Sequence, residues 1–289
     1  MLPFLESLRP KQWAKNGIIF AALVFDVQLF RPAPFLRTLA GFALMCLLSS
    51  AVYLINDLAD IEKDRQHPKK RNRPLPSGRL PKNTALAAAV VLPFIALPLA
   101  FLLDWRFGLI ALTYLVKDLL YSYRLKDTPI IDVLLIALGF LLRVSAGVVI
   151  ITVARFSPWL YICMGLLALF MAFGKRRGEL VLLQNGRGET RAVLKEYSLP
   201  FLDEMINLVS TATLIAYSLY TFSAPNLPQN HTMMLTIPFI LYGILRYLYL
   251  IHMKGEGGAP DELVLSDRPL QITFIVWGLA VVLIMYLST

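Results

Sequence analysis

The sequence predicts an all-α polytopic membrane protein with about nine transmembrane helices. Hydrophobic residues make up 57% of the chain and charged residues only 16%, and the mean hydropathy is +0.63. Soluble domains hold roughly 45–50% apolar and 25% charged residues. Apolar stretches of near-spanning length recur along the whole chain, and helices satisfy their own backbone hydrogen bonds in lipid. These observations exclude an ordinary soluble protein and predict a single helical membrane domain over residues 1–289.

The chain begins with a short amphipathic segment, Met1–Asn16, that we expect at the membrane interface. Trp13 can lie there at headgroup depth beside basic residues such as Lys15. Nine apolar stretches follow, of which the first is short and is expected to begin nearer Trp13. The predicted spans are Gly17–Phe30, Phe35–Ile55, Thr84–Leu103, Phe107–Tyr123, Pro129–Val149, Pro158–Gly174, Phe201–Phe222, Met233–Ile251 and Pro269–Leu287.

Basic residues are distributed unevenly between the two sides of this topology. With the N-terminus in the cytoplasm, about 22 of the 28 Lys and Arg residues fall in inside segments, as the positive-inside rule expects. Topology and anionic lipid headgroups therefore explain much of the net charge of +9, and no nucleic-acid partner is implied. The inside loops are long and polar, so we expect function to face the cytoplasm. These loops cover about residues 57–83, 175–199 and 252–268.

The stretch Asn56–Asp64 ends the second predicted span. On one continuous helix, at about 100° per residue, Asp57, Asp60 and Asp64 share a face, and Asn56 lies one turn below Asp60. Three carboxylates on one face repel each other unless a cation neutralises them. Such hard oxygen ligands suit Mg²⁺, which keeps several waters and takes further ligands from a substrate phosphate. A solvated acidic face at the membrane boundary is the alternative explanation.

A basic loop follows this acidic stretch directly. It contains Lys69, Lys70, Arg71 and Arg73. The positive-inside rule accounts for some of these charges, but not for the close spacing of acids and bases in one segment. An acidic metal cradle beside a basic cluster is suited to a metal-complexed phosphate ester.

Two further polar runs lie at predicted helix ends. Lys175 and Glu179 are four residues apart, so they either form an intrahelical ion pair or bind a ligand, with Arg176 or Arg177 free to meet a phosphate. An aromatic and basic run, Tyr121–Asp127, lies at another membrane edge and includes Tyr123 and Lys126. It is interpreted either as an interfacial anchor or as part of a binding site.

Three single residues also stand out. Asp132 lies just inside the fifth predicted span, where an ionisable group is expected to line a cavity. Arg143 lies deeper in the same span and is a functional candidate, or else a structural partner of a carboxylate or of helix-end carbonyls. Asp267 can cap the last span, which Pro269 can open, and capping alone would explain this site.

These residues resemble the UbiA superfamily of intramembrane prenyltransferases. The resemblance is carried by Asn56-Asp57-x-x-Asp60-x-x-x-Asp64 and by Lys70-Arg71-Asn72-Arg73-Pro74 with Ser77-Gly78. Within the superfamily the chain is most similar to the decaprenyl-phosphate phosphoribosyltransferases. That similarity rests on Leu8-Arg9-Pro10-Lys11-Gln12-Trp13-x-Lys15-Asn16, Gly174-Lys175-Arg176-x-x-Glu179-Leu180, Arg191-x-x-Leu194-x-x-Tyr197 and Ser266-Asp267-Arg268-Pro269-Leu270.

The resemblance implies a UbiA-type helical bundle with a polar cavity open to the cytoplasm. It implies Mg²⁺-dependent transfer of 5-phosphoribose from phosphoribosyl diphosphate to a decaprenyl-type polyprenyl phosphate, with release of diphosphate. The product would supply an arabinose-donor lipid for arabinan in the cell envelope. The implied setting is the inner membrane, among membrane lipids, and a homo-oligomer is compatible with it.

The implied site residues follow the matched motifs. Asn56, Asp57, Asp60 and Asp64 would form the catalytic, metal-binding set. The implied substrate-binding residues are Lys15, Lys70, Arg71, Arg73, Tyr123, Lys126, Asp132, Arg143, Lys175, Arg176 and Glu179.

Two alternatives remain open. A prenyltransferase of the same fold would move a prenyl chain from a prenyl diphosphate to an aromatic acceptor, but such enzymes carry a second Asp-rich motif where this chain has Lys175–Glu179. A lipid-phosphate carrier without catalysis would use the same polar cavity, and it would not need the carboxylates of a metal site.

Overall fold

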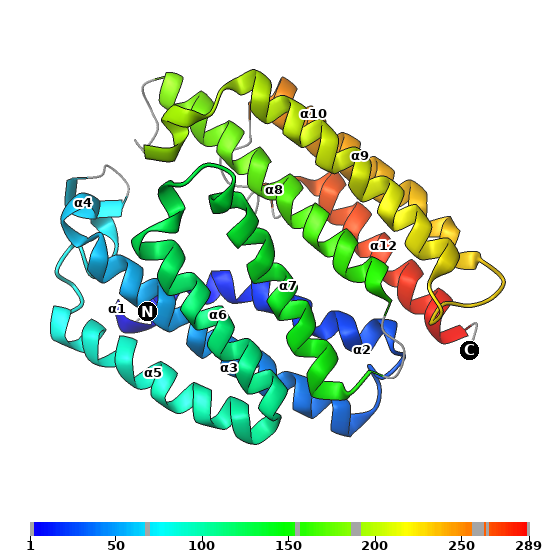
Figure 1. Cartoon of the computed structure of the whole chain (residues 1–289), viewed down its shortest axis with the longest axis horizontal. Helices are drawn as coiled ribbons and strands as arrows, with labels where there is room; N and C mark the ends of the chain where they lie inside the picture. The colour runs from blue at the N-terminus through cyan, green and yellow to red at the C-terminus, as the bar shows by residue number, and fades with distance from the viewer. Residues whose placement is uncertain are drawn as a thin grey trace. The chain divides into compact units, whose positions relative to one another are not determined.

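The computed structural model describes residues 3–66, 70–153, 157–185, 192–255, 263 and 266–287, and this part of the chain contains helices and turns but no strands (Figure 1). Seven helical segments within it are long and apolar enough to cross a membrane. The predicted all-α membrane fold is confirmed. The seven segments are α3 (Pro32–Ala59), α5 (Lys82–Leu103), α7 (Ile131–Ile151), α8 (Pro158–Gln184), α9 (Leu199–Ser223), η5 with α10 (Thr232–Met253) and α12 (Arg268–Leu287).

The predicted count of nine spans is only approximate. The fourth predicted span is a single helix, α6 (Trp105–Tyr123), but three charged residues, Arg106, Lys117 and Asp118, lie within its 19 residues, and it is not among the seven. The first predicted span is a 3₁₀ helix, η1 (Pro10–Phe20), that leads into the short α2 (Ala21–Phe25). The remaining short helices are α1 (Pro3–Ser7), α4 (Ile61–Gln66), η2 (Lys70–Asn72), η3 (Leu125–Asp127) and η4 (Ala192–Glu196).

The chain divides into two compact units, which are described separately below. Unit 1 comprises Met1–Leu23, Gln28–Tyr123 and Leu142–Val153. Unit 2 comprises Val24–Val27, Arg124–Leu141 and Ala154–Thr289, so the boundary passes through α7.

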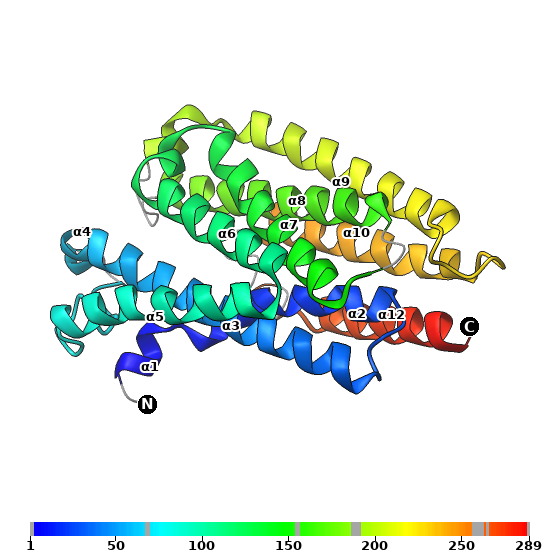
Figure 2. The same cartoon turned by 60° about the horizontal axis from the view of Figure 1, so that its bottom comes forward.

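In unit 1, α3 packs against α5, and α5 packs against α6 (Figures 1 and 2). The buried side of α5 carries alanines, whose small side chains allow neighbouring helix backbones to approach closely. These are Ala85, Ala89, Ala96 and Ala100. The other side of α5 exposes large apolar residues such as Phe94, at 78%, and Leu102, at 81%. A helix with a small-residue inner face and a large apolar outer face suits contact with lipid.

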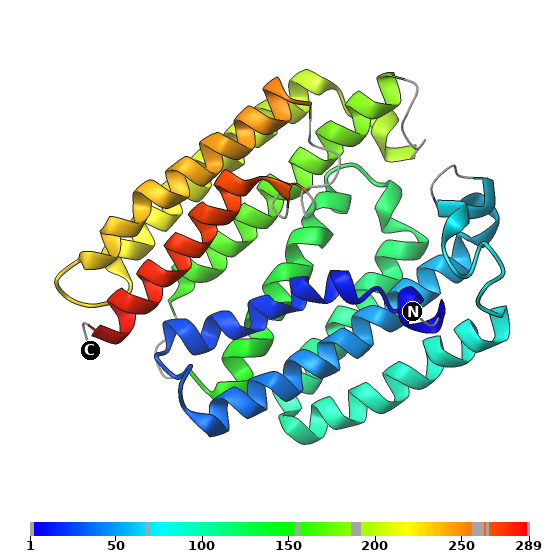
Figure 3. The same ribbon diagram turned by 180° about the vertical axis from the view of Figure 1, so that it is seen from behind.

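The 3₁₀ helix η1 lies along α3 and touches α7 within unit 1 (Figure 3). A Cβ added to Gly147 of α7 would lie 2.1 Å from the carbonyl oxygen of Ile19. Only glycine permits this backbone approach, because the obstructing atom belongs to the main chain and cannot rotate away. Gly147 therefore fixes the distance between η1 and α7.

In unit 2, α8 packs against α9, and α10 packs against both α9 and α12 (Figure 3). Its core combines apolar residues from α7 to α12 with residues of η4. Among the core residues are Val133, Phe170, Phe173, Leu194, Leu202, Ile206, Tyr247 and Leu270.

The contact at Gly147 generates a testable prediction. Gly147→Ala should destabilise the protein in detergent by roughly 1–3 kcal/mol, because the new methyl group forces η1 away from α7. The matched control is Gly165→Ala, whose Cβ would meet side-chain atoms of Leu141 at an ordinary 3.6 Å. Thermal unfolding measures both variants, and equal melting temperatures would contradict the close-approach argument.

Candidate active site

The acidic motif lies where α3 ends and α4 begins. The predicted continuous helix through Asp64 is wrong, because α3 stops at Ala59 and the backbone of Asp60 leaves the helical conformation, with φ −101° and ψ 12°. Backbone bonds still cross the interruption: Asp60 N donates to Asn56 O at 3.0 Å, and Asp64 N donates to Asp60 O at 2.8 Å. The interruption changes the direction of the chain between Asp57 and Asp64.

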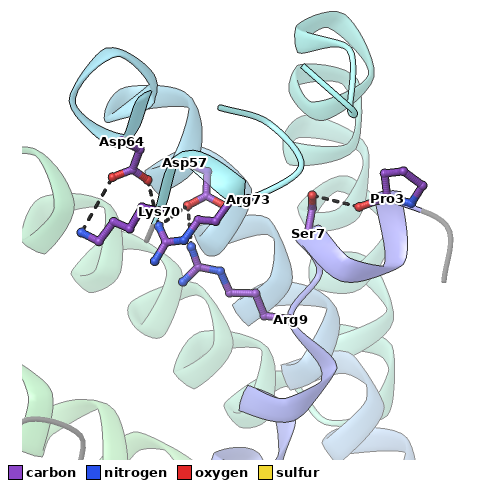
Figure 4. A network of polar contacts seen from close by, with 7 residues as sticks. All are labelled: Pro3, Ser7, Arg9, Asp57, Asp64, Lys70 and Arg73. Carbon is purple, nitrogen blue, oxygen red and sulfur yellow. Dashed lines mark hydrogen bonds and ion pairs between the residues drawn. The ribbon is translucent and has the colours of Figure 1, made fainter. Parts of the chain in front are cut away.

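Two carboxylates of the motif converge on one cation, the guanidinium of Arg73 (Figure 4). Arg73 Nη1 donates to Asp57 Oδ1 at 3.2 Å and to Asp64 Oδ2 at 2.8 Å. Lys70 Nζ lies 3.7 Å from the other oxygen of Asp64. Both carboxylates are buried, so these basic partners offset the cost of removing two negative charges from water. The prediction that acids and bases of this segment form one cluster is confirmed for these four residues.

A third basic residue, Arg9, reaches the same cluster from the N-terminal segment. Its Nη2 donates to Asp57 Oδ1 at 2.5 Å (Figure 4). Its guanidinium also lies 4.9 Å from the ring centre of Tyr53. Sequence reasoning did not assign Arg9 to the site. Periodicity cannot pair residues 48 positions apart, and the signal that could have found Arg9 was its place in the N-terminal motif Leu8-Arg9-Pro10 that carries the resemblance.

The predicted cradle of three carboxylates is not formed. Within the described part of the chain, no three His, Cys, Asp or Glu side chains are grouped so that they could hold a metal ion. Asp60 and Asn56 are half-buried, while Asp57 and Asp64 are buried and share a cation. A pair of carboxylates that already converges on one positive charge still fits Mg²⁺, because this ion takes one or two carboxylates and fills its other positions with water and phosphate.

The other predicted residues of unit 1 lie around this cluster or deeper in the helices. Arg71 is exposed in η2, and Lys15 is half-buried in η1. Tyr123 is exposed at the last position of α6. The structure does not connect these three residues to the carboxylates by any described contact.

Arg143 is buried in a polar network inside unit 1. Its Nε donates to Asn16 Oδ1 at 2.7 Å, and its Nη2 donates to the hydroxyl of Tyr114 at 2.9 Å, with the guanidinium also 4.8 Å from the ring centre of Tyr114. Asn16 in turn donates to Ser49 Oγ at 3.1 Å. These contacts join η1, α3, α6 and α7, so the structural explanation of Arg143 has direct support from its contacts with Asn16 and Tyr114.

In unit 2, Asp132 and Arg176 form a fully buried ion pair. Arg176 Nε donates to Asp132 Oδ2 at 2.5 Å, and both side chains are essentially unexposed. Tyr197 OH donates to Asp132 Oδ1 at 2.8 Å and accepts a bond from Ile130 N at 2.7 Å. Burial raises the pKa of Tyr197 to about 12, so this hydroxyl keeps its proton. The Asp132–Arg176 ion pair is therefore part of a buried hydrogen-bond network that also includes Tyr197.

This network corrects one expectation for the second polar run. Glu179 pairs with Arg176 of the same helix, at 2.6 Å. Neither arginine is free to meet a phosphate in this structure, since Arg177 donates to Asp203 Oδ1 at 2.5 Å and to Ile251 O at 3.0 Å. Lys175 and Lys126 are half-buried in α8 and η3.

The last predicted polar feature is a helix cap. Asp267 Oδ1 accepts a bond from Leu270 N at 3.0 Å, and Arg246 of α10 bonds both Asp267 oxygens at 3.2 and 2.8 Å. The hydrogen bonds from Arg246 hold the pKa of Asp267 below its usual value. Capping of α12 by Asp267 is therefore confirmed. Arg191, which belongs to another motif of the family resemblance, lies outside the described residues.

The chain is similar to known proteins in both sequence and fold. The decaprenyl-phosphate phosphoribosyltransferase of Corynebacterium glutamicum is 34% identical, over 98% of this chain and 86% of that protein. The enzyme of the same name from Mycolicibacterium smegmatis is 33% identical, over 94% and 89%. A UbiA homolog from Archaeoglobus fulgidus, solved bound to DMAPP and Mg²⁺, is 21% identical with a TM-score of 0.73, over 96% of this chain and 98% of that one, and shows the same fold.

The family itself follows from a match over most of the chain. A model of the UbiA prenyltransferase family matches residues 18–260, which include the acidic motif, the basic loop and the buried Asp132–Arg176 pair. The chain is an integral membrane protein and belongs to the UbiA prenyltransferase family.

Proposed function

We propose that this protein transfers 5-phosphoribose from phosphoribosyl diphosphate to a polyprenyl phosphate of the decaprenyl type, with release of diphosphate. The observation that carries the proposal is similarity over nearly the full chain to proteins named decaprenyl-phosphate phosphoribosyltransferase. The clustered charges of unit 1 agree with such chemistry, because the donor is a highly charged phosphate ester.

The charge balance of the cluster favours an anionic ligand. Two carboxylates, Asp57 and Asp64, are contacted by three basic side chains, those of Arg9, Lys70 and Arg73. The surplus positive charge, together with exposed Arg71, suits the phosphates of the donor. A cation shared by Asp57 and Asp64 would add to it, and a solved homologue of the same fold was bound to Mg²⁺.

The reaction breaks the bond between C1 of the ribose and the diphosphate oxygen, and it forms a bond from C1 to an oxygen of the lipid phosphate. Asp57 and Asp64 would hold the Mg²⁺, with Asn56 and Asp60 assigned to the same site by the motif. When bound, Mg²⁺ would neutralise charge on the departing diphosphate. Lys70, Arg71 and Arg73 would bind donor phosphates while the ribosyl centre gains oxocarbenium character.

The acceptor needs little activation by the protein. A phosphate monoester has a second pKa of about 6, so a lipid phosphate is already anionic near neutral pH. Catalysis would then depend on positioning and charge stabilisation and would not need a strong general base. Lys15, on the N-terminal side of unit 1, is our candidate for the lipid phosphate, because it is half-buried beside the interfacial Trp13.

Two lysines of unit 2, Lys126 and Lys175, are proposed to bind phosphate groups. Asp132, Arg176 and Glu179 already satisfy one another, so we assign them to holding α7 and α8 together within unit 2. The proposed setting is the inner membrane with the N-terminus and the site facing the cytoplasm, and the proposed product feeds synthesis of a cell-envelope arabinan.

The first test is the reaction itself. Membranes containing the protein, given phosphoribosyl diphosphate labelled in the ribose and a decaprenyl phosphate, should move label into the lipid phase when Mg²⁺ is present. Chelation of Mg²⁺ should abolish the transfer, because the carboxylates then lack the cation that the diphosphate requires. Extraction and scintillation counting measure the product. Activity with a prenyl diphosphate and an aromatic acid, without ribosyl transfer, would favour the prenyltransferase alternative instead.

The second test addresses the carboxylates. Asp57→Asn and Asp64→Asn should each lower kcat by roughly 100-fold or more, since each removes a charge that neutralises the cation. The matched control is Glu62→Gln, another acid of α4, whose 74% exposed side chain bonds Arg65 and should be dispensable. Steady-state kinetics of folded, purified protein give the values. Wild-type kcat in either Asp variant would remove that residue from the site, and the same assay of Asp60→Asn decides whether the third carboxylate belongs to it.

A further inference from the structure

The N-terminal segment Pro3–Phe20 is anchored over the acidic end of α3. The carboxylate of Glu6 accepts bonds from Arg79 at 2.9 and 3.2 Å, just beyond the basic loop. Trp13 Nε1 donates to Ser50 Oγ at 3.0 Å, and Ser50 Oγ lies 3.0 Å from the carbonyl oxygen of Leu8. The segment is therefore held on both sides of Arg9 by contacts within unit 1.

Arg9 is presented to the site by an unusual backbone conformation. Its φ of 53° and ψ of 60° lie in the left-handed region, which is unfavourable for a residue with a Cβ and is retained only where the surroundings enforce it. Pro10 follows directly and further restricts the backbone of Arg9. Such enforced conformations occur preferentially at functional sites.

Asp57 Oδ1 accepts bonds from both arginines of the cluster. Arg73 bonds both Asp57 and Asp64, whereas Arg9 bonds Asp57, at 2.5 Å, and not Asp64 in the described part of the chain. A divalent cation held by Asp57 needs the lone pairs of the same carboxylate. Arg9 and a metal ion therefore compete for one ligand.

We propose that Arg9 is the counter-ion of Asp57 before a metal binds, and that loading of the site exchanges Arg9 for the metal. This inference rests on the proposed function, in which Asp57 is a metal ligand. Exchange releases a guanidinium beside the carboxylate at the moment when donor phosphates arrive with the metal, and phosphates are preferred partners of arginine. Arg9 is thus a positioning residue that couples the N-terminal segment to the state of the site.

The exchange is tested by metal binding without any donor. Mn²⁺ alone is titrated into purified protein, and electron paramagnetic resonance measures the free ion. Arg9→Gln should bind Mn²⁺ about tenfold more tightly than wild type, because the variant removes both the competitor and a repelling charge. Arg9→Lys keeps the charge but loses the planar fork, so it should bind about threefold more tightly.

The matched control is Arg79→Gln, which loosens the N-terminal segment by removing the bonds to Glu6 but leaves both arginines on Asp57. Its Mn²⁺ affinity should equal that of wild type. Unchanged or weaker affinity in both Arg9 variants overturns the proposal, as does equal tightening in Arg79→Gln.

Asp57→Asn separates failure of this inference from failure of the proposed function. If Asp57→Asn loses Mn²⁺ binding while the Arg9 variants bind as wild type does, the exchange is wrong and the metal site stands. If Asp57→Asn binds Mn²⁺ as wild type does, the assignment of Asp57 as a metal ligand is wrong. The proposed exchange of Arg9 for the metal is then wrong as well.

Discussion

Neutralisation of buried carboxylates is the constraint on which the candidate site depends. Asp57 and Asp64 are removed from water at the end of a membrane helix, where an unpaired charge costs several kcal/mol. Arg73 can reach both only if the chain turns back after α4, and Arg9 can reach Asp57 only if the N-terminal segment crosses the end of α3. The path of two separate segments is thus set by the need to supply positive charge to one place.

The same constraint organises unit 2 with different partners. Asp132 is satisfied by Arg176 and Tyr197, and Arg177 is satisfied by Asp203 and a backbone carbonyl. In both cases the acid and the base come from different helices, so each of these two ion pairs also fixes how two helices pack. This UbiA fold combines an apolar exterior with ion pairs and hydrogen bonds between helices. Each of these ion pairs joins a particular acid to a particular base.

Hydropathy was sufficient to predict most of the helices, because lipid imposes one requirement on every span. Sequence reasoning predicted α5, α9 and α12 within a few residues, and it also predicted the cap at Asp267. It failed where tertiary contacts decide the outcome. Helical periodicity assumes an unbroken helix, so it placed Asp60 with Asp57 and Asp64. Sequence spacing also left Arg176 or Arg177 free for a phosphate, whereas Arg176 pairs with buried Asp132 and Arg177 with Asp203. Arg9 was missed because no local pattern records a partner across the fold.

The bond between Arg246 and Asp267 bears on how this membrane protein meets bilayers of different thickness. Helix α12 has 20 residues, so at about 1.5 Å per residue it spans roughly the 30 Å of a typical hydrocarbon core. Its first turn is bound to the side of α10 by a two-pronged ionic contact, which prevents the two helices from sliding past one another. In a thinner membrane, α10 and α12 must then tilt together as a single body. Hydrophobic mismatch with the lipid is accommodated by rotating both helices at once.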